Sequence, residues 1–172
     1  MELLVRKTAT GHCELSAGSL VMRCAIGRTG MTTLKAEGDG GTPVGTWPLR
    51  RVFYRQDRVS CPVTGLPTTI ISPDDGWCDA PADPNYNRPV KLPYPASAEE
   101  MWRQDNVYDI VVELGYNDDP VIDGRGSAIF LHLARANYEP TAGCVAVALD
   151  DMRALLALLK PGAVIRIDPE IY

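Results

Sequence analysis

The sequence predicts a mainly β fold, a single-domain mixed β-sandwich or sheet with one helix in the C-terminal half. The chain has 172 residues, within the usual range of one domain, so residues 1–172 are expected to form a single domain. Its 15 glycines and 14 prolines predict many turns, and therefore strands rather than a helical bundle. One segment, residues 151–160, has the apolar spacing of an amphipathic helix.

Runs of β-forming residues predict three strands in the first half, at residues 3–8, 20–26 and 47–54. A Gly/Ser turn at residues 16–19 separates the first two. Alternation along the second run predicts that Cys24 is a small core residue. Residues 37–46 contain four glycines and one proline, which favours a turn region over a helix. The segment lacks the Gly-Lys-Ser/Thr ending of a phosphate-binding loop.

The second half begins with the least regular segment, residues 72–95, whose six prolines predict a long irregular loop within the domain. Residues 98–104 are expected to form one or two helical turns. Apolar runs then predict three strands, 108–114, 127–133 and 163–167. Before the last strand, the helix of residues 151–160 is expected to start at a capping Asp150 or Asp151 and to end at Pro161-Gly162.

Composition excludes several classes of function. The net charge of −5 argues against a nucleic acid or an anionic membrane as partner, because both require a basic patch. No run approaches the ~20 apolar residues of a transmembrane segment. The five cysteines contain no Cys-x-x-Cys pair, and the acidic residues lack calcium-loop spacing, so no metal site and no cofactor are expected.

The localisation predicted from the sequence is uncertain. The N-terminus lacks the apolar core of a secretory signal, which favours the cytoplasm. The five loosely spaced thiols, which cannot all pair with one another, also favour a reducing compartment.

One pair of residues suggests chemistry. His132 ends an apolar strand, and Cys144 follows twelve residues later beside Gly143. An imidazole that accepts a thiol proton turns cysteine into a strong nucleophile. A glycine beside the sulfur lets substrate approach, and backbone N–H groups of residues 143 and 144 would face a developing oxyanion. From the residues alone, a buried thiol and a hydrogen-bonded strand-end histidine remain an alternative.

The order of strand, His132, loop and Thr141-x-Gly143-Cys144-Val145 resembles the catalytic signature of the L,D-transpeptidase (YkuD-like) family. Residues 38–47 resemble the upstream Thr-Pro-x-Gly-x-aromatic segment of that family, and residues 150–168 resemble its terminal helix and strand. Residues 55–106 lie outside the resemblance.

The resemblance implies a cysteine acyl-transferase that acts on peptidoglycan stem peptides, either as an L,D-transpeptidase or as an L,D-carboxypeptidase. Cys144 would attack the third residue of a tetrapeptide stem, expel the terminal D-alanine and form a thioester that passes to an amine or to water. His132 would be the base, oriented by the main chain of Leu133. The resemblance also implies a carbapenem as a possible inhibitor, and a periplasmic or cell-wall location that conflicts with the absent signal.

Three positions depart from the family pattern: Leu133 stands for Gly, Ala142 for His and Ala146 for Arg. The departures resemble a branch that includes hydrolases of peptidoglycan–protein links, and they leave the choice between transfer and hydrolysis open. A non-catalytic relative that binds cell-wall peptides and an unrelated β-rich protein are further alternatives.

Four further residues are candidates for substrate binding, although each also has a structural interpretation. Thr141 lies within the motif, and Arg125 precedes the histidine strand as a cation for an anionic substrate. Trp77 and Tyr86 of the long loop would wall a cleft, or else pack that loop against the core.

Overall fold

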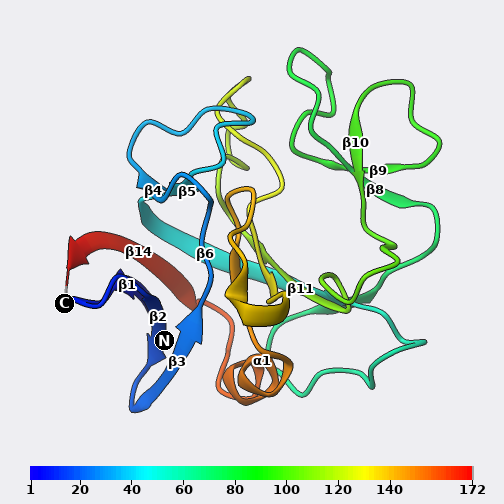
Figure 1. The fold of residues 1–172 in the computed structure, drawn as a ribbon. Coiled ribbons are helices and arrows are strands. Elements are labelled where there is room, and N and C mark those ends of the chain that lie inside the picture. The colour runs from blue at the N-terminus through cyan, green and yellow to red at the C-terminus, as the bar shows by residue number, and fades with distance from the viewer. Residues whose placement is uncertain (172) are drawn as a thin grey trace.

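The computed structural model describes residues 1–171, with side chains through Glu170, and it confirms the mainly β prediction (Figure 1). It contains one α-helix, α1 (Leu149–Leu156), and one short 3-10 helix, η1 (Ala136–Tyr138), within these residues. The strands are β1 (Glu2–Lys7), β2 (Cys13–Ala17), β3 (Leu20–Cys24), β4 (Met31–Thr32), β5 (Thr42–Pro43), β6 (Gly45–Tyr54), β7 (Thr68–Ile70), β8 (Asp75–Cys78), β9 (Pro89–Lys91), β10 (Ala98–Glu100), β11 (Ile110–Leu114), β12 (Phe130–Leu133), β13 (Val145–Val147) and β14 (Val164–Ile171).

The main sheet has nine strands in the order β13-β12-β11-β6-β14-β1-β2-β3, with β7 paired to β6 outside this path. The first and last strands of the chain, β1 and β14, pair in parallel in the middle of the sheet (Figure 1). The sheet curls so far that its two ends meet. Just beyond β3, the N–H of Ala25 donates to the carbonyl of Ala146 at 2.8 Å, and the reverse bond is 2.9 Å. The end of β3 is thereby placed beside β13, which follows Cys144.

Strand β11 separates two hydrophobic cores, which explains why all five of its residues are buried. Ile110, Val112 and Leu114 face the larger core inside the curled sheet, together with the buried side of α1. Val111 points to the opposite face and packs in the smaller core with Trp77, Phe130 and Cys144. The candidate nucleophile therefore lies in the smaller core, between the main sheet and the segment of β8–β10.

Residues 72–95 are expected to be an irregular loop, but the structure places two strands in them, β8 and β9. Strands β8, β9 and β10 form a separate antiparallel sheet in the order β10-β8-β9, at the right of Figure 1. Residues 98–104 do not form the expected helical turns, because Ala98–Glu100 pairs with β8. The prolines occupy the turns and the edge strand β9, where no missing N–H interrupts the ladder.

Two more differences concern the ends of the chain. The residues of β2 were not expected to form a strand, although Cys13, Leu15 and Ala17 alternate onto the core face. The helix α1 is shorter than predicted, and its N-cap is Ala148, which provides no side-chain hydrogen bond. Asp150 and Asp151 lie instead in its first turn, where negative charge still stabilises a helix. No helix in the described part of the chain is long and apolar enough to cross a membrane.

Candidate active site

The loop that carries Cys144 is fixed by its own hydrogen bonds. The hydroxyl of Thr141 donates to the carbonyl of Cys144 at 2.7 Å and accepts from the N–H of Gly143 at 3.1 Å. Gly143 has φ of +141°, and a Cβ there would lie 2.9 Å from the carbonyl oxygen of Gly41. Glycine is therefore required by both its backbone angle and its close neighbour.

These bonds change two expectations from the sequence. The N–H of Gly143 is directed at Thr141 in this structure, so it is not a free donor for an oxyanion. The hydroxyl of Thr141 is likewise used within the loop, although the residue lines the cavity described below. Both residues position Cys144 rather than reaching toward a substrate.

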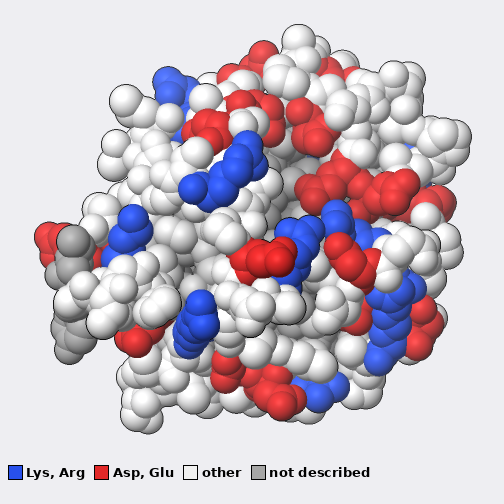
Figure 2. Space-filling view, in the orientation of Figure 1, with Lys and Arg blue, Asp and Glu red and all other residues white. Residues whose placement is uncertain are grey.

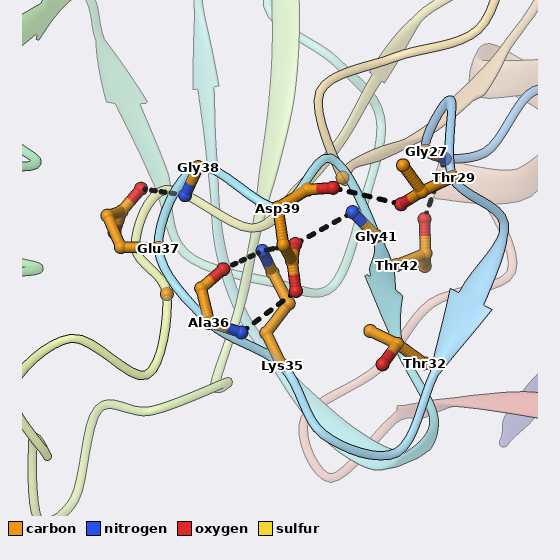
Figure 3. A network of polar contacts seen from close by, with 12 residues as sticks. Gly27, Thr29, Thr32, Lys35, Ala36, Glu37, Gly38, Asp39, Gly41 and Thr42 are labelled. Atoms are coloured by element: carbon orange, nitrogen blue, oxygen red, sulfur yellow. Dashed lines mark hydrogen bonds and ion pairs between the residues drawn. The ribbon is translucent and has the colours of Figure 1, made fainter.

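The segment after β3 holds the same loop from outside. The N–H of Thr141 donates to the carbonyl of Ile26, and the N–H of Arg28 donates to the carbonyl of Thr141, both at 2.9 Å. Gly27 lies between them, and a Cβ at that position would lie 2.2 Å from the carbonyl of Gly40. Its N–H donates to the hydroxyl of Thr42 at 2.8 Å (Figure 3). The glycine-rich segment thus packs directly behind the cysteine loop.

The thiol of Cys144 is buried and hydrogen-bonded. It donates to the carbonyl of Ala128 at 3.2 Å and accepts from the N–H of Phe130 at 3.3 Å. Burial raises the pKa of this thiol to about 12, and the nearby negative charge of Glu99 adds to the increase. The residue is only 7% exposed, so the group at rest is a neutral thiol at neutral pH.

His132 is held in one tautomer by its own strand. Its Nδ1 lies 2.9 Å from the carbonyl oxygen of Leu133, which can only accept, so Nδ1 carries the proton of the neutral ring. This leaves Nε2 as an unprotonated base. Burial lowers the pKa of His132 to about 4, against the opposing effect of the Leu133 hydrogen bond. The carbonyl contact expected from the sequence is therefore present.

His132 and Cys144 line one cavity of about 490 Å³. Figure 2 shows basic and acidic side chains around a recess near the centre of the molecule's face. The charged residues that line the cavity carry both signs: Arg28, Lys35, Arg103, Arg135, Glu37, Asp79 and Glu99. The thiol hydrogen is directed at Ala128 in this resting arrangement, so proton transfer to the imidazole requires a rotation of the cysteine side chain.

The turn between β4 and β5 supplies Lys35 and Glu37 to the cavity wall, and Figure 3 shows how Lys35 is held. The Lys35 ammonium group contacts the Asp39 carboxylate at 2.5 Å, and Asp39 also accepts from the N–H groups of Ala36 and Gly41 at 2.8 Å. The positive charge of the buried Lys35 is thus balanced by the carboxylate of Asp39 in the same turn.

The positions of three predicted substrate contacts do not support that role. Trp77 is buried, and its indole N–H donates to Asn87 at 2.9 Å. Tyr86 is buried as well, and its hydroxyl donates to Glu37 at 2.5 Å, so it supports a wall residue from behind. Arg125 is exposed and lines a different depression beside Trp47. None of the three lines the Cys144 cavity.

Sequence reasoning missed most of the charged wall. Glu99 and Arg103 come from the end of the segment that resembled no family, Tyr108 follows it at the start of a predicted strand, and no motif marks any of the three. The hydroxyl of Tyr108 donates to Glu99 at 2.6 Å, and the ring of Tyr108 packs edge-on against His132 with centroids 5.4 Å apart. Among the residues that the structure describes, no three His, Cys, Asp or Glu side chains are arranged to hold a metal ion.

The buried imidazole makes the stability of the fold dependent on pH. The pKa of His132 in the folded chain is about 4, below the usual 6.5. As pH falls from 6.5 to 4, the unfolded chain therefore binds a proton at this residue while the folded chain does not, and the folded state loses stability. We expect the wild type to lose roughly 3 kcal/mol more than a His132→Asn variant over this interval. Urea unfolding at several pH values measures the difference. Parallel curves for the two proteins would show that His132 is not buried neutral.

Residues 4–167 match the family model of the L,D-transpeptidase catalytic domain. Among solved structures, Mycobacterium tuberculosis L,D-transpeptidase 1 is 12% identical with a TM-score of 0.41, over 99% of this chain and 62% of the other. The L,D-transpeptidase from Mycobacterium smegmatis is 13% identical with a TM-score of 0.40, over 96% and 58%. The chain thus spans about three fifths of each. A comparison with curated protein sequences found no match.

Proposed function

The chain belongs to the L,D-transpeptidase catalytic domain family, and from this premise we propose that it is a cysteine acyl-transferase that acts on peptidoglycan stem peptides. The observation that carries the proposal is one cavity lined by both His132 and Cys144. The imidazole in that cavity is neutral, with Nε2 unprotonated, and is therefore able to accept the thiol proton. The walls carry both charges, which suits a peptide that contains a diamino acid and several carboxylates.

The proposed first half-reaction forms a thioester. The thiol hydrogen leaves the carbonyl of Ala128, Nε2 of His132 takes the proton, and Sγ of Cys144 attacks the carbonyl carbon of the third stem residue. Because burial keeps the thiol and the imidazole neutral at rest, proton transfer accompanies attack rather than preceding it. The tetrahedral intermediate then breaks its C–N bond, and the leaving amine takes the proton from the imidazolium.

In the proposed second half-reaction the thioester passes to water more readily than to an amine. Transfer to an amine requires a side chain that holds the acceptor against the thioester. Ala142 is exposed on the cavity wall beside Cys144 and offers no hydrogen bond or charge. Ala146 pairs with His132 between β12 and β13, but it is 1% exposed and does not line the cavity, so it offers no contact to an acceptor.

The partition between the two acceptors tests this proposal. With a tetrapeptide donor and a competing diamino-acid acceptor, we expect the tripeptide from hydrolysis to exceed the cross-linked product, even at high acceptor concentration. Mass spectrometry of the products measures the ratio. An Ala142→His variant, which restores a polar group on the cavity wall, is expected to shift the ratio toward cross-linking.

Three other outcomes would favour other functions. A dominant cross-linked product in the wild type would identify a transpeptidase, with the carboxylates of Asp79 and Glu99 as the candidate contacts for the acceptor amine. Asp79 Oδ1 is buried and lacks a hydrogen-bond partner within the described residues, so this oxygen is free to accept a hydrogen bond from an ammonium group. Tight binding of stem peptides without any turnover would identify a binding protein, and cleavage of peptidoglycan–protein links alone would identify the alternative hydrolase.

A further inference from the structure

We infer that Arg28 binds the terminal carboxylate of the donor peptide, so that the enzyme removes a residue only from a free C-terminus. The inference rests on the proposed function, because it assigns a group on the leaving side of the same cavity. Arg28 lies outside every motif identified in the sequence, and only its place in the cavity lining identifies it as a candidate.

The main chain places Arg28 beside the nucleophile. Its N–H donates to the carbonyl of Thr141 at 2.9 Å, three residues before Cys144. Its side chain lines the cavity together with Ala142 and Cys144. The backbone on both sides of the contact is fixed by the bonds of the cysteine loop, so the side chain of Arg28 extends from a defined point on that loop.

The other three cations of the cavity already have carboxylate partners. Lys35 contacts Asp39 at 2.5 Å, Arg103 contacts Asp105 at 2.7 Å, and Arg135 lies 3.8 Å from Asp105. Arg28 differs, because its guanidinium donates to one backbone carbonyl, that of Gly38, at 3.3 Å. Among the described residues it contacts no carboxylate, so its charge is available to an anionic ligand.

The side chain of Arg28 is held over a glycine. A Cβ at Gly40, which has φ of +71°, would lie 2.7 Å from Cζ of Arg28. The guanidinium group therefore lies close to the backbone of Gly40 in the glycine-rich segment. This support restricts the arginine while leaving donors free, and a planar guanidinium with two parallel donors fits a carboxylate better than an ammonium group does.

The chemistry of the donor peptide determines which of its carboxylates lies close enough to bind Arg28. When Sγ attacks the third residue, the leaving residue begins one bond away, and consecutive Cα atoms are about 3.8 Å apart. The carboxylate of that leaving residue is therefore the substrate anion tied most closely to the sulfur. The carboxylates of Asp79 and Glu99 also line the cavity, and they disfavour an anion on their side. The carboxylate of Glu37 already accepts hydrogen bonds from Tyr86, Ser127 and the N–H of Gly38. The charge pattern thus orients the peptide with its C-terminus toward Arg28.

Two matched substrates test the inference: a tetrapeptide stem with a free C-terminal carboxylate and the same peptide with a carboxamide. We expect the wild type to prefer the acid in kcat/KM by roughly 10- to 100-fold, the usual effect of a hydrogen-bonded charge. Arg28→Ala is expected to bring the ratio close to one, and Arg28→Lys to restore part of it. The control is Arg23→Ala, which removes an exposed cation that is bonded to Asn137 and does not line the cavity.

The outcomes separate this inference from the proposed function. If the wild type cleaves both peptides equally well, or if Arg28→Ala keeps the preference for the acid, the inference is wrong and the hydrolase stands. If the wild type cleaves neither peptide, the proposed function fails. Calorimetric binding of both peptides to a Cys144→Ser protein still reports on Arg28 in that case, and equal affinities would overturn the carboxylate site.

Discussion

Replacing Cys144 with serine is expected to reduce turnover of a tetrapeptide stem by at least about a thousand-fold, because a hydroxyl is a far weaker nucleophile near neutral pH. The fold should survive the change. A serine hydroxyl can donate to the carbonyl of Ala128 and accept from the N–H of Phe130, as the thiol does. Steady-state kinetics measure the loss, and thermal unfolding checks that the variant is folded.

Cys61 provides the matched control for this prediction. Its thiol is exposed and lies outside the cavity, so Cys61→Ser should keep full activity. A carbapenem offers an independent readout, since we expect one covalent adduct on Cys144, detected by mass spectrometry, that Cys144→Ser abolishes. An adduct on another cysteine, or near-normal activity of the serine variant, would assign the nucleophile elsewhere.

The second large effect concerns His132. A His132→Asn variant is expected to lose roughly 100- to 10,000-fold in kcat/KM, the usual contribution of a general base. The asparagine amide can still donate to the carbonyl of Leu133, where Nδ1 lies 2.9 Å away in the wild type, but it provides no base. The comparison therefore removes the proton acceptor and keeps the local hydrogen bond.

The pH profile distinguishes a missing base from a damaged fold. Because the pKa of His132 is about 4 and that of Cys144 about 12, the wild-type kcat/KM should be level between about pH 6 and 9 and fall as pH approaches 4. In His132→Asn the rate should instead rise with pH as the thiol ionises without help. An activity that peaks near pH 6.5 in the wild type would show that the imidazole is not buried as described.

The sequence predicts correctly those strands that are marked by a continuous run of β-forming residues. Strands β3, β6 and β11 follow from runs of β-forming residues, and the predicted burial of Cys24 is confirmed. The sheet of β8–β10 was missed, because its strands are short, the turns between them are rich in proline, and the partners that pair lie 12 to 24 residues apart in the chain. A pattern of local propensity carries no information about such pairing.

The same distinction applies to the site. His132, Gly143 and Cys144 lie in one short stretch, so a motif brings them to notice. Arg28 and Glu99 reach the cavity only because the sheet curls and the segment of β8–β10 folds against it. The aromatic residue Trp77 misled the prediction for a related reason: its packing against Phe130 buries it in the smaller core, 5.0 Å between ring centroids, behind the cavity wall.

The central position of β14 has a consequence for how the chain acquires its activity during synthesis. β14 leaves the ribosome after strands β1–β13, yet it stands between β6 and β1, so the β1–β3 hairpin gains its strand partner β14 only after residues 164–171 are synthesised. That hairpin carries Ile26 and Arg28 to the cysteine loop. A nascent chain that ends before residue 164 therefore holds His132 and Cys144 but lacks the strand that joins β1 to β6, and we expect the thiol to become competent only once residues 164–171 have been added.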